Sequence, residues 1–486
     1  MPRVFGHYVP AQLLALTAIE ASIVFGSVFL GLALPLVGFH AIRPAWGDAF
    51  APAAILAALV LVTAHIAGLY DTRHIHGRRE LLLRLAMAFA AAYLVIAMLG
   101  YFLWPLTIGR KAFLLSFLTA FPASFAVRLV HDRLTAGSRA RRKVLMLGSG
   151  EVSRMIAETV STSHHAYELV GRLDANGNGS GGDGAGGEAG DGVWSLGAME
   201  DLDWIAKVTR PDVIVVALEE RRGTLPVSDI VECKLRGIEV EDWPSFYEKL
   251  TGKIPLSNLR PSWLVFADGF KPARLTLLTK RAIDLVVSAT LCAVSLPAML
   301  AVAVLIKFDT PGPVFFRQER IGQFGRVFSI FKFRSMRLDA HLLPGPKPGE
   351  PDPRVTRAGH FLRRTRLDEL PQLFNVFLGD MSLVGPRPEW VALVPEFRDK
   401  VPLYLHRLAV KPGITGWAQV KNPYGATVEN TWEKLQYDLY YIKNLSIFLD
   451  MLILLHTIQI VLFTRGSGEW KNRKQAPSTT SVSYAG

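Results

Sequence analysis

The sequence predicts a membrane protein built from four N-terminal transmembrane helices, an α/β Rossmann-like cytoplasmic domain, and a second, monotopic α/β domain with a re-entrant membrane helix. Three observations lead to this prediction. Half of the 486 residues are hydrophobic, and the chain opens with four apolar runs of about 20 residues, the length that crosses a bilayer. A strand-like run then leads into Gly-x-Gly. A fifth apolar run is interrupted by Ser295-Leu296-Pro297.

Residues 1–135 make up the predicted four-helix transmembrane region. Its apolar runs cover residues 13–37, 49–70, 82–104 and 112–130. Arginines concentrate in the connector at residues 71–84 and after the fourth run, and Arg110 and Lys111 reduce this asymmetry only slightly. Because positively charged connectors stay in the cytoplasm, we expect both places and the N-terminus on that side. The first run is too long for a cleavable signal peptide.

The charge and the cysteine content narrow the possible partners. The net charge of +12 suits anionic lipids, phosphorylated substrates or nucleic acid. Since the apolar runs already supply a membrane explanation, we expect no nucleic-acid partner. The only cysteines, Cys233 and Cys292, are too few for a disulfide framework or a cysteine metal site.

Residues 140–260 are expected to form the Rossmann-like domain. The segment VLMLGSGEVSRMIAETV at residues 144–160 predicts a strand, a tight turn and a helix. Ser153 stands where the dinucleotide fingerprint has its third glycine, so a turn without a cofactor is favoured and a bound nucleotide stays open as the alternative. The glycine-rich stretch at residues 176–192 cannot bury a core and predicts a flexible insertion.

Other chemistries in this middle region find little support. Neither Tyr167 nor Tyr247 is followed four residues later by lysine, which disfavours a dehydratase or epimerase of the dehydrogenase-like type. Asp201-Leu202-Asp203 matches a metal-binding Asp-x-Asp of glycosyltransferases, but the start of a helix is the simpler interpretation. Gly252-Lys253 is followed by isoleucine and makes no Walker motif.

The fifth apolar run, within residues 275–310, decides the topology. If it crossed the bilayer, the arginines and lysines that follow would be outside the cell, against the charge rule. A helix that enters, breaks at Pro297 and returns avoids this conflict, with Ser295 satisfying the freed carbonyl group. A spanning helix with a proline kink is the alternative. Residues 312–336 then alternate like two strands joined by a turn.

The strongest candidate for a site is the carboxylate pair Asp368-Glu369, which follows Arg363, Arg364 and Arg366. Thr365 is a candidate helix N-cap, and the helix dipole and the arginines would then lower the pKa of the carboxylates. An ionised aspartate, a divalent cation and arginines suit phosphoryl transfer. The alternative is a pair that only complements the helix dipole.

Three segments carry a resemblance to a known family. FKFRSM at residues 331–336, LDELPQLFNVFLGDMSLVGPRP at 367–388 and KPGITGWAQV at 411–420 follow the interrupted apolar run in this order. They resemble the bacterial sugar transferases, the monotopic polyprenyl-phosphate hexose-1-phosphate transferases. The resemblance covers residues 279–466, and the preceding part is similar to the accessory half of the large members that start exopolysaccharide repeat units.

The resemblance implies a reaction and its central residues. Hexose-1-phosphate would pass from a UDP-sugar to undecaprenyl phosphate, releasing UMP and forming a lipid-linked diphosphate sugar at the cytoplasmic face of the bacterial inner membrane. Asp368 would be the nucleophile, through a covalent aspartyl-phosphosugar, and Glu369 would lie beside it. Both would bind Mg²⁺. Arg363 would contact phosphate, and Arg387 would belong to the donor-site motif.

Further positions carry over with less defined roles. Lys332 and Arg334 fall in the strand motif and are expected to bind substrate, while Ser295 and Pro297 match the break of the re-entrant helix. Many relatives have Gly-Arg after the WAQV motif, whereas this chain has Lys421 and Asn422. Lys421 is expected to substitute, although lysine cannot form the bidentate fork of arginine.

The remaining expectations concern domains and alternatives. Residues 311–466 would form the catalytic domain, residues 447–464 would lie along the interface or on the protein, and residues 467–486 would be a disordered tail. The N-terminal half is expected to support a homo-oligomer, such as a dimer. The alternatives are a membrane scaffold or nucleotide-sensing regulator of polysaccharide assembly, and a glycosyltransferase in which the lipid phosphate attacks the donor directly.

Overall fold

The computed structural model describes most of the chain in two compact units, which we treat separately. The first unit contains residues 1–18 and 124–450, and the second contains residues 19–123 and 451–486. The described residues are 3–4, 7–8, 11–33, 46–70, 78–137, 141–162, 167–174, 194–218, 225–257, 267–340, 342–343, 352–422 and 428–463. The predicted insertion at residues 176–192 and the predicted tail at 467–486 lie outside them.

Helices of membrane-spanning length form the N-terminal region, as predicted. They are α1 (Ala11–Ala33), α2 (Trp46–Ile66), α3 (Arg78–Phe102) and α4 (Arg110–Gly137). Two short antiparallel strands, β1 (Arg3–Val4) and β2 (His7–Tyr8), precede them, and a 3-10 turn, η3 (Trp104–Leu106), joins α3 to α4. Among the described residues, these four helices and α10 (Arg274–Asp309) are long and apolar enough to cross a membrane.

Polar side chains inside the second unit pair with one another. The Tyr70 hydroxyl donates to Glu20 of α1 at 2.7 Å, which gives this buried carboxylate a partner. The final helix, α16 (Ile447–Phe463), contributes its residues from Met451 onward to the same unit. There the His456 ring packs edge-on against the His65 ring at 5.0 Å. The last apolar run therefore packs on protein, one of the two placements that the sequence suggests.

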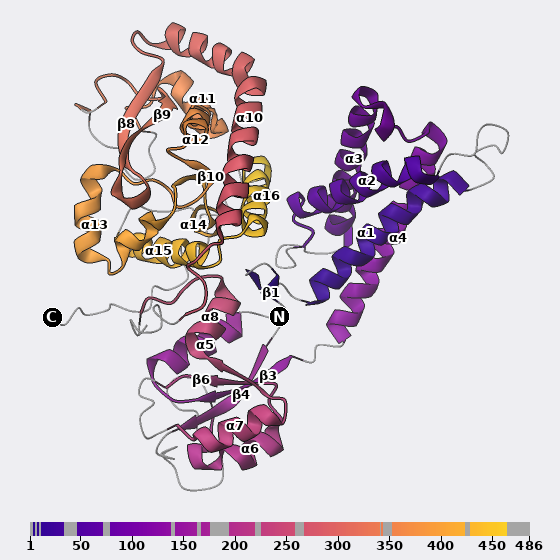
Figure 1. Ribbon diagram of the computed structural model, residues 1–486, viewed down its shortest axis with the longest axis vertical. Coiled ribbons are helices and arrows are strands. Elements are labelled where there is room, and N and C mark those ends of the chain that lie inside the picture. The colour runs from indigo at the N-terminus through magenta and orange to yellow at the C-terminus, as the bar shows by residue number, and fades with distance from the viewer. Residues whose placement is uncertain are drawn as a thin grey trace. The chain divides into compact units, whose positions relative to one another are not determined.

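The Rossmann-like domain contains one parallel sheet with the strand order β5-β4-β3-β6-β7 (Figure 1). Its strands are β3 (Arg142–Leu147), β4 (Tyr167–Asp174), β5 (Ser195–Ala198), β6 (Val213–Val216) and β7 (Glu239–Asp242). Helices α5 (Glu151–Thr162) and α8 (Trp243–Thr251) cover one face. The other face packs on η4 (Met199–Asp201), α6 (Leu202–Thr209) and α7 (Val227–Leu235).

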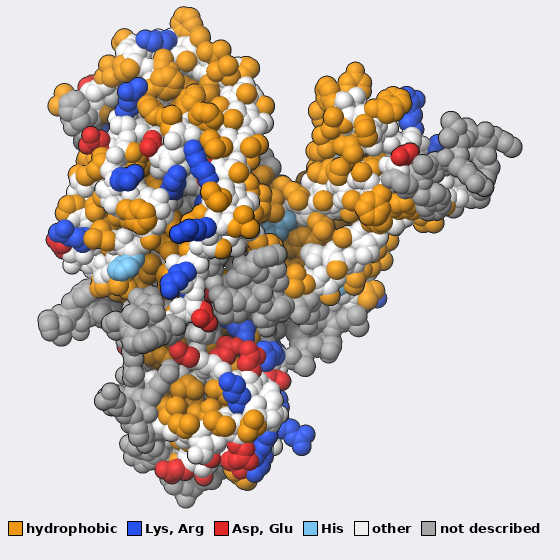
Figure 2. Space-filling model, viewed as in Figure 1, with side chains coloured by type: hydrophobic (Ala, Val, Ile, Leu, Met, Phe, Trp, Pro, Cys, Tyr) orange, Lys and Arg blue, Asp and Glu red, His pale blue; other side chains and the backbone are white. Residues whose placement is uncertain are grey.

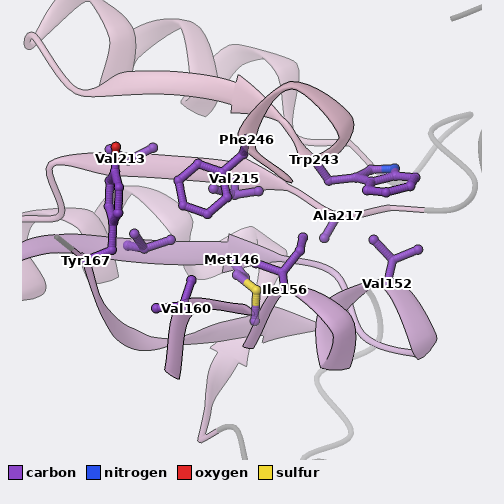
Figure 3. Packing of buried hydrophobic residues seen from close by; sticks show 11 residues of the cluster. Met146, Val152, Ile156, Val160, Tyr167, Val213, Val215, Ala217, Trp243 and Phe246 are labelled. Carbon is purple, nitrogen blue, oxygen red and sulfur yellow. The ribbon is translucent and has the colours of Figure 1, made fainter. Parts of the chain in front are cut away.

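The turn after β3 is closed by the protein's own side chains. Gly148 has a φ of +122°, and a Cβ there would lie 2.8 Å from the carbonyl oxygen of Ala217. The buried Ser153 hydroxyl donates to the Gly148 carbonyl at 2.7 Å. Trp243 packs in the same apolar cluster as Val152 and Ala217, close to this turn (Figure 3). Serine at the third glycine position thus has a structural use in the turn.

Asp201-Leu202-Asp203 begins a helix, as the simpler interpretation states. Asp203 lies in the first turn of α6, where it pairs with Lys207 at 2.5 Å and with Arg236 at 2.6 Å. These two cations lower the pKa of Asp203. The carboxylate is therefore committed to surface ion pairs.

The C-terminal part is a small α/β arrangement packed along α10 (Figure 1). Strands β8 (Phe315–Ile321) and β9 (Val327–Phe333) pair antiparallel around the turn η5 (Gln323–Gly325), which confirms the predicted hairpin. The elements that follow are α11 (Arg357–Thr365), η6 (Leu367–Glu369), α12 (Gln372–Leu378), β10 (Ser382–Val384), η7 (Val391–Leu393), α13 (Val394–Lys400), η8 (Tyr404–Ala409), β11 (Gly413–Thr415), α14 (Trp417–Lys421) and α15 (Val428–Lys443).

Helix α10 remains continuous through Ser295 and Pro297, so the predicted break is not an interruption of the helix. The Ser295 hydroxyl donates to Cys292 at 3.5 Å, whereas the carbonyl that a proline frees lies four residues before it. The helix packs on the C-terminal part at both ends. Asp284 and Ser288 are buried near its start, and Met299, Val302 and Ile306 are buried near its end. Between these contacts, residues 289–298 include no buried residue.

Candidate functional site

The two predicted carboxylates lie in the short turn η6, between helices α11 and α12. Helix α11 was not predicted: the Thr356 hydroxyl accepts a hydrogen bond from the Gly359 amide at 2.9 Å and caps its N-terminus. Thr365 is the last residue of that helix and donates to Phe361, so the prediction that it is an N-cap was wrong. Arg366 then reverses the chain with a φ of +60°.

Glu369 joins two cations from different segments. Its Oε1 accepts hydrogen bonds from Lys332 of β9 at 2.9 Å and from Arg387 of the Pro-Arg-Pro motif at 3.2 Å. Burial alone would raise the pKa of Glu369, but Arg387 and Lys332 outweigh it and lower the pKa to about 2. The fold thus brings together Lys332, Glu369 and Arg387, which span 55 positions in the chain. All three are predicted site residues, and they meet at one carboxylate oxygen.

Asp368 is buried and, unlike its neighbour, forms no ion pair with any residue that the structure describes. Its Oδ1 receives no hydrogen bond from any of the described residues. Burial, followed by the charge of Glu369, raises the pKa of Asp368 despite the opposing effect of Lys332 and Arg363. The sequence predicts a lowered pKa for both carboxylates. This holds for Glu369, whereas at Asp368 burial and the ionised neighbour outweigh the arginines and the pKa is raised.

The two carboxylates also fit a magnesium ion. Mg²⁺ binds in proteins through one or two carboxylates, and phosphate oxygens of the substrate complete its shell. The buried Asp368 Oδ1, which receives no hydrogen bond from the described residues, and the adjoining Glu369 match this pattern. Over the residues that the structure describes, no three His, Cys, Asp or Glu side chains cluster to form a separate metal site.

The other predicted cations have different positions. Arg363 is exposed at the end of α11, and its Nε donates to the Ser335 hydroxyl at 2.9 Å. Arg334 is buried and donates to the Pro311 and Thr310 carbonyl oxygens at 2.7 and 2.8 Å. It therefore holds the chain that leaves α10 and does not reach the carboxylates. In Figure 2, the visible face of the C-terminal part carries Lys and Arg side chains among apolar side chains.

Lys421, at the end of α14, takes part in a separate contact. Its Nζ lies 4.6 Å from the centre of the Trp417 ring, a cation–π distance. The described contacts of Glu369 come from Lys332 and Arg387 and do not include Lys421.

Helix α12 is held by two polar side chains that sequence reasoning missed. The buried Asn375 accepts from the Phe331 amide at 3.0 Å and donates to the Ser329 carbonyl at 2.8 Å, which joins α12 to β9. Arg281 of α10 donates to the carbonyl oxygens of Val376 and Phe377 at 2.7 and 2.9 Å. A cation at a helix C-terminus satisfies free carbonyls and complements the dipole.

Strand β10, which leads into the Pro-Arg-Pro motif, is also tied to α10. Asp284 accepts from the Leu383 amide at 3.0 Å, and Lys280 donates to the Val384 carbonyl at 3.0 Å. Lys280 also pairs with Asp450 at 2.6 Å. These polar contacts fix the position of β10, and so the start of the segment that leads to Arg387.

Arg407 supports the same motif from the other side. It is buried, and its Nη2 donates to the Arg387 carbonyl at 3.1 Å and pairs with Asp438 at 2.9 Å. Its Nη1 donates to the Tyr404 hydroxyl at 3.2 Å. The only sequence signal for this pair was a charged residue inside each of two largely apolar runs, which does not reveal that the two meet.

Comparison with known proteins shows the family to which the C-terminal part is similar. A family model described as bacterial sugar transferase matches residues 275–464. The exopolysaccharide production protein PSS of Rhizobium leguminosarum bv. phaseoli is 43% identical over 200 residues, which are 40% of this chain and 100% of that protein. The chain belongs to the bacterial sugar transferase family.

Two longer relatives match this sugar transferase over more residues than the family model does. The UDP-N-acetylgalactosamine-undecaprenyl-phosphate N-acetylgalactosaminephosphotransferase of Aeromonas hydrophila is 42% identical over 233 residues, 48% of this chain and 54% of that protein. The undecaprenyl-phosphate glucose phosphotransferase of Komagataeibacter xylinus is 35% identical over 346 residues, 68% of this chain and 61% of that protein. The alignments thus span little more than half of these two relatives.

The match to the sugar transferase family model covers α10 through α16 and contains every site residue described above. The N-terminal helices and the Rossmann-like domain precede it. The three family segments fall on β9, on the stretch from η6 to the Pro-Arg-Pro motif, and on β11 with α14. The carboxylate site is therefore formed where two of these segments meet.

The contact between α12 and β9 can be tested by replacing Asn375 with leucine. The variant Asn375→Leu leaves the Phe331 amide and the Ser329 carbonyl buried without their partner, which should destabilise this contact by about 3 kcal/mol. Hydrogen exchange at the β9 amides should become faster, while the β3 amides of the Rossmann-like domain keep their protection. Unchanged exchange in β9 would show that Asn375 does not hold the helix.

Proposed function

We propose that this protein transfers hexose-1-phosphate from a UDP-sugar to undecaprenyl phosphate, forming a lipid-linked diphosphate sugar and UMP. Membership of the sugar transferase family supports this, as do the undecaprenyl-phosphate substrates in the names of two relatives. The observation that carries the proposal is the buried Asp368 Oδ1, which lacks a donor among the described residues and lies beside a Glu369 already neutralised by two cations. The name of the Rhizobium relative supports a role in exopolysaccharide production, and we propose that the reaction is its initiating step.

The proposed reaction has two displacements at the same phosphorus. Ionised Asp368 attacks the phosphorus that carries the sugar, the bond to the bridging oxygen breaks, and UMP leaves with the electron pair. An oxygen of undecaprenyl phosphate then attacks the aspartyl-phosphosugar, and the Asp368 carboxylate is released. Lys332, Arg387 and Arg363 stabilise the charge on the phosphate oxygens. Mg²⁺ held by Asp368 and Glu369 would neutralise further phosphate charge.

We infer from the packing of α10 that this helix enters the membrane without carrying the C-terminal part across it. Both of its halves contact the same C-terminal part, and residues 289–298 between them are about half of the ~20 residues that a spanning helix needs. Because the continuous helix α10 packs on the C-terminal part near both of its ends, it would keep that part on one side of the membrane. We place it on the cytoplasmic face of the bacterial inner membrane, where nucleotide sugars are made and where the charge rule puts the basic segments.

A homo-oligomer supported by the N-terminal half remains a further prediction. Its test is the mass of the full-length protein in native-like membranes, and a monomer there would contradict it.

Replacing the nucleophile should abolish turnover. In membranes supplied with a UDP-sugar, Mg²⁺ and undecaprenyl phosphate, Asp368→Asn should reduce UMP release by about 10³-fold or more, since loss of a nucleophile removes the covalent route. Asp399→Asn, which changes an exposed carboxylate of α13, is the matched control and should stay close to the unmodified protein. Comparable activity of the two variants would rule out Asp368. A panel of UDP-glucose, UDP-galactose and their N-acetyl forms would identify the donor.

The raised pKa of Asp368 predicts an acid limb in the pH profile. Because the ionised form attacks, kcat/KM should increase with pH as Asp368 loses its proton, above the ordinary pKa of 3.8. Lys332 lowers this pKa, so Lys332→Met should move the limb to higher pH. Lys400→Met, in an exposed ion pair, should leave the limb in place. A limb that moves to lower pH in Lys332→Met would contradict the electrostatic account.

A further inference from the structure

Gln372, the first residue of α12, follows the carboxylate pair by one helical turn. It comes four residues after Asp368 and three residues after Glu369. The chain between them is helical, because the amides of Leu370 and Leu373 donate to carbonyl oxygens three residues earlier, at 3.2 and 3.1 Å. Side chains three and four residues apart lie on the same side of a helix. Gln372 therefore belongs to the face that carries the two carboxylates.

The amide group of Gln372 is buried without a hydrogen-bond acceptor. The residue is 2% exposed, and its Nε2, which can only donate, reaches no acceptor among the described residues. Asn375, three residues further along α12, shows the usual arrangement, since its amide group bonds to the backbone of both Phe331 and Ser329. A buried donor without an acceptor destabilises a fold, so a ligand that accepts from it is the explanation to test.

Asp368 Oδ1 is the complementary group on the same face, a buried acceptor that receives no hydrogen bond from the described residues. Glutamine and aspartate one helical turn apart can bond to each other, but these two do not. A cation at position 372 would form an ion pair with Asp368 and reduce its reactivity as a nucleophile. A neutral amide supplies a donor at this position and leaves the carboxylate reactive.

Helix geometry also directs Gln372 toward the carboxylates. The Cα–Cβ bonds of a helix tilt toward its N-terminus, so a long side chain covers the turn that precedes it. The turn that precedes Gln372 is η6, which contains Asp368. The oxygens of a phosphoryl group bonded to Asp368 would therefore lie on the side to which the glutamine extends. Because both side chains are shielded from water, a hydrogen bond to a charged oxygen is strong there.

We propose that Gln372 is a catalytic residue: its Nε2 donates a hydrogen bond to a phosphoryl oxygen of the hexose-phosphate while this group is transferred to and from Asp368. The inference rests on the proposed function and deepens it. The contact transfers no proton and leaves the two displacements as described above. It stabilises the charge that develops on the phosphoryl oxygens, as a preorganised donor does in a water-excluded site.

Replacement of the amide by methionine tests this role in the full-length protein. Gln372→Met keeps the length of the side chain and removes the donor, so it should lower kcat for UMP release by about 10²-fold, the usual effect of losing one such donor. Because an unpaired buried amide is replaced by an apolar group of similar shape, the Tm should stay the same or rise. A merely structural role of Gln372 would instead lower the Tm.

Gln323→Met is the matched control. The Gln323 amide of η5 has a partner, since it donates to the Ala409 carbonyl at 3.0 Å. Its replacement removes a hydrogen bond that is present, so it should not raise the Tm, and it should leave kcat within about twofold. The two glutamine variants are thus expected to differ in opposite ways in activity and stability.

A second variant keeps the test decisive if Gln372→Met fails to fold. Gln372→Asn is smaller and cannot overpack the site, but its amide is shorter by one methylene group, so kcat should fall by about tenfold or more. An unchanged kcat in the folded variant, or a lower Tm that accompanies the loss of kcat in Gln372→Met, would overturn the inference. Absence of UMP release from the unmodified protein would instead refute the proposed function, so the two failures are distinguishable.

Discussion

The ion pairing of Glu369 is the interaction on which the rest of the site depends. One carboxylate oxygen binds Lys332 from β9 and Arg387 from the Pro-Arg-Pro motif, so three separate segments meet at one point. Charges buried in this way are stable only while all partners are present. With both cations paired with Glu369, Asp368 keeps a raised pKa and an oxygen that receives no hydrogen bond from the described residues, which leaves this oxygen available for the nucleophilic role that we propose.

The segments that meet at Glu369 are held from behind by buried polar contacts. Lys280 and Asp284 of α10 fix β10, and Arg407 with Asp438 fixes the backbone of Arg387. The membrane helix is therefore a structural part of the site. A helix that carried only an anchoring role would not need charged residues buried against the strand that leads to the site, and this coupling agrees with a reaction in which one substrate is a lipid.

The sequence predicted the structure correctly where the pattern was local, and it predicted the site residues where the family motifs were long. Apolar runs predicted the N-terminal helices, and the Gly-x-Gly turn predicted the parallel sheet. The family segments predicted that Asp368, Glu369, Lys332 and Arg387 belong together, although nothing in the spacing alone shows their contact. Burial was the information that the sequence lacked.

Burial explains the predictions that failed or were missed. The pKa of Asp368 is raised because the side chain is buried beside an ionised neighbour, while the nearby arginines in the sequence suggested the opposite. Thr365 looked like a helix start because the helix before it, which Thr356 caps, was not recognised. Arg334 belongs to a family motif, yet its side chain binds the chain that follows α10. Arg407 and Asp438 are distant in the sequence, so only the folded structure shows that they pair.

The most direct test of the central claim is a search for the covalent intermediate. The purified full-length protein is incubated with the preferred UDP-sugar and Mg²⁺ without undecaprenyl phosphate, and the peptide containing Asp368 is examined by mass spectrometry. The account predicts one equivalent of UMP and a hexose-phosphate adduct on Asp368 that disappears when undecaprenyl phosphate is added. UMP release that requires undecaprenyl phosphate, with no adduct at any time, would contradict it and show that the lipid phosphate attacks the donor directly.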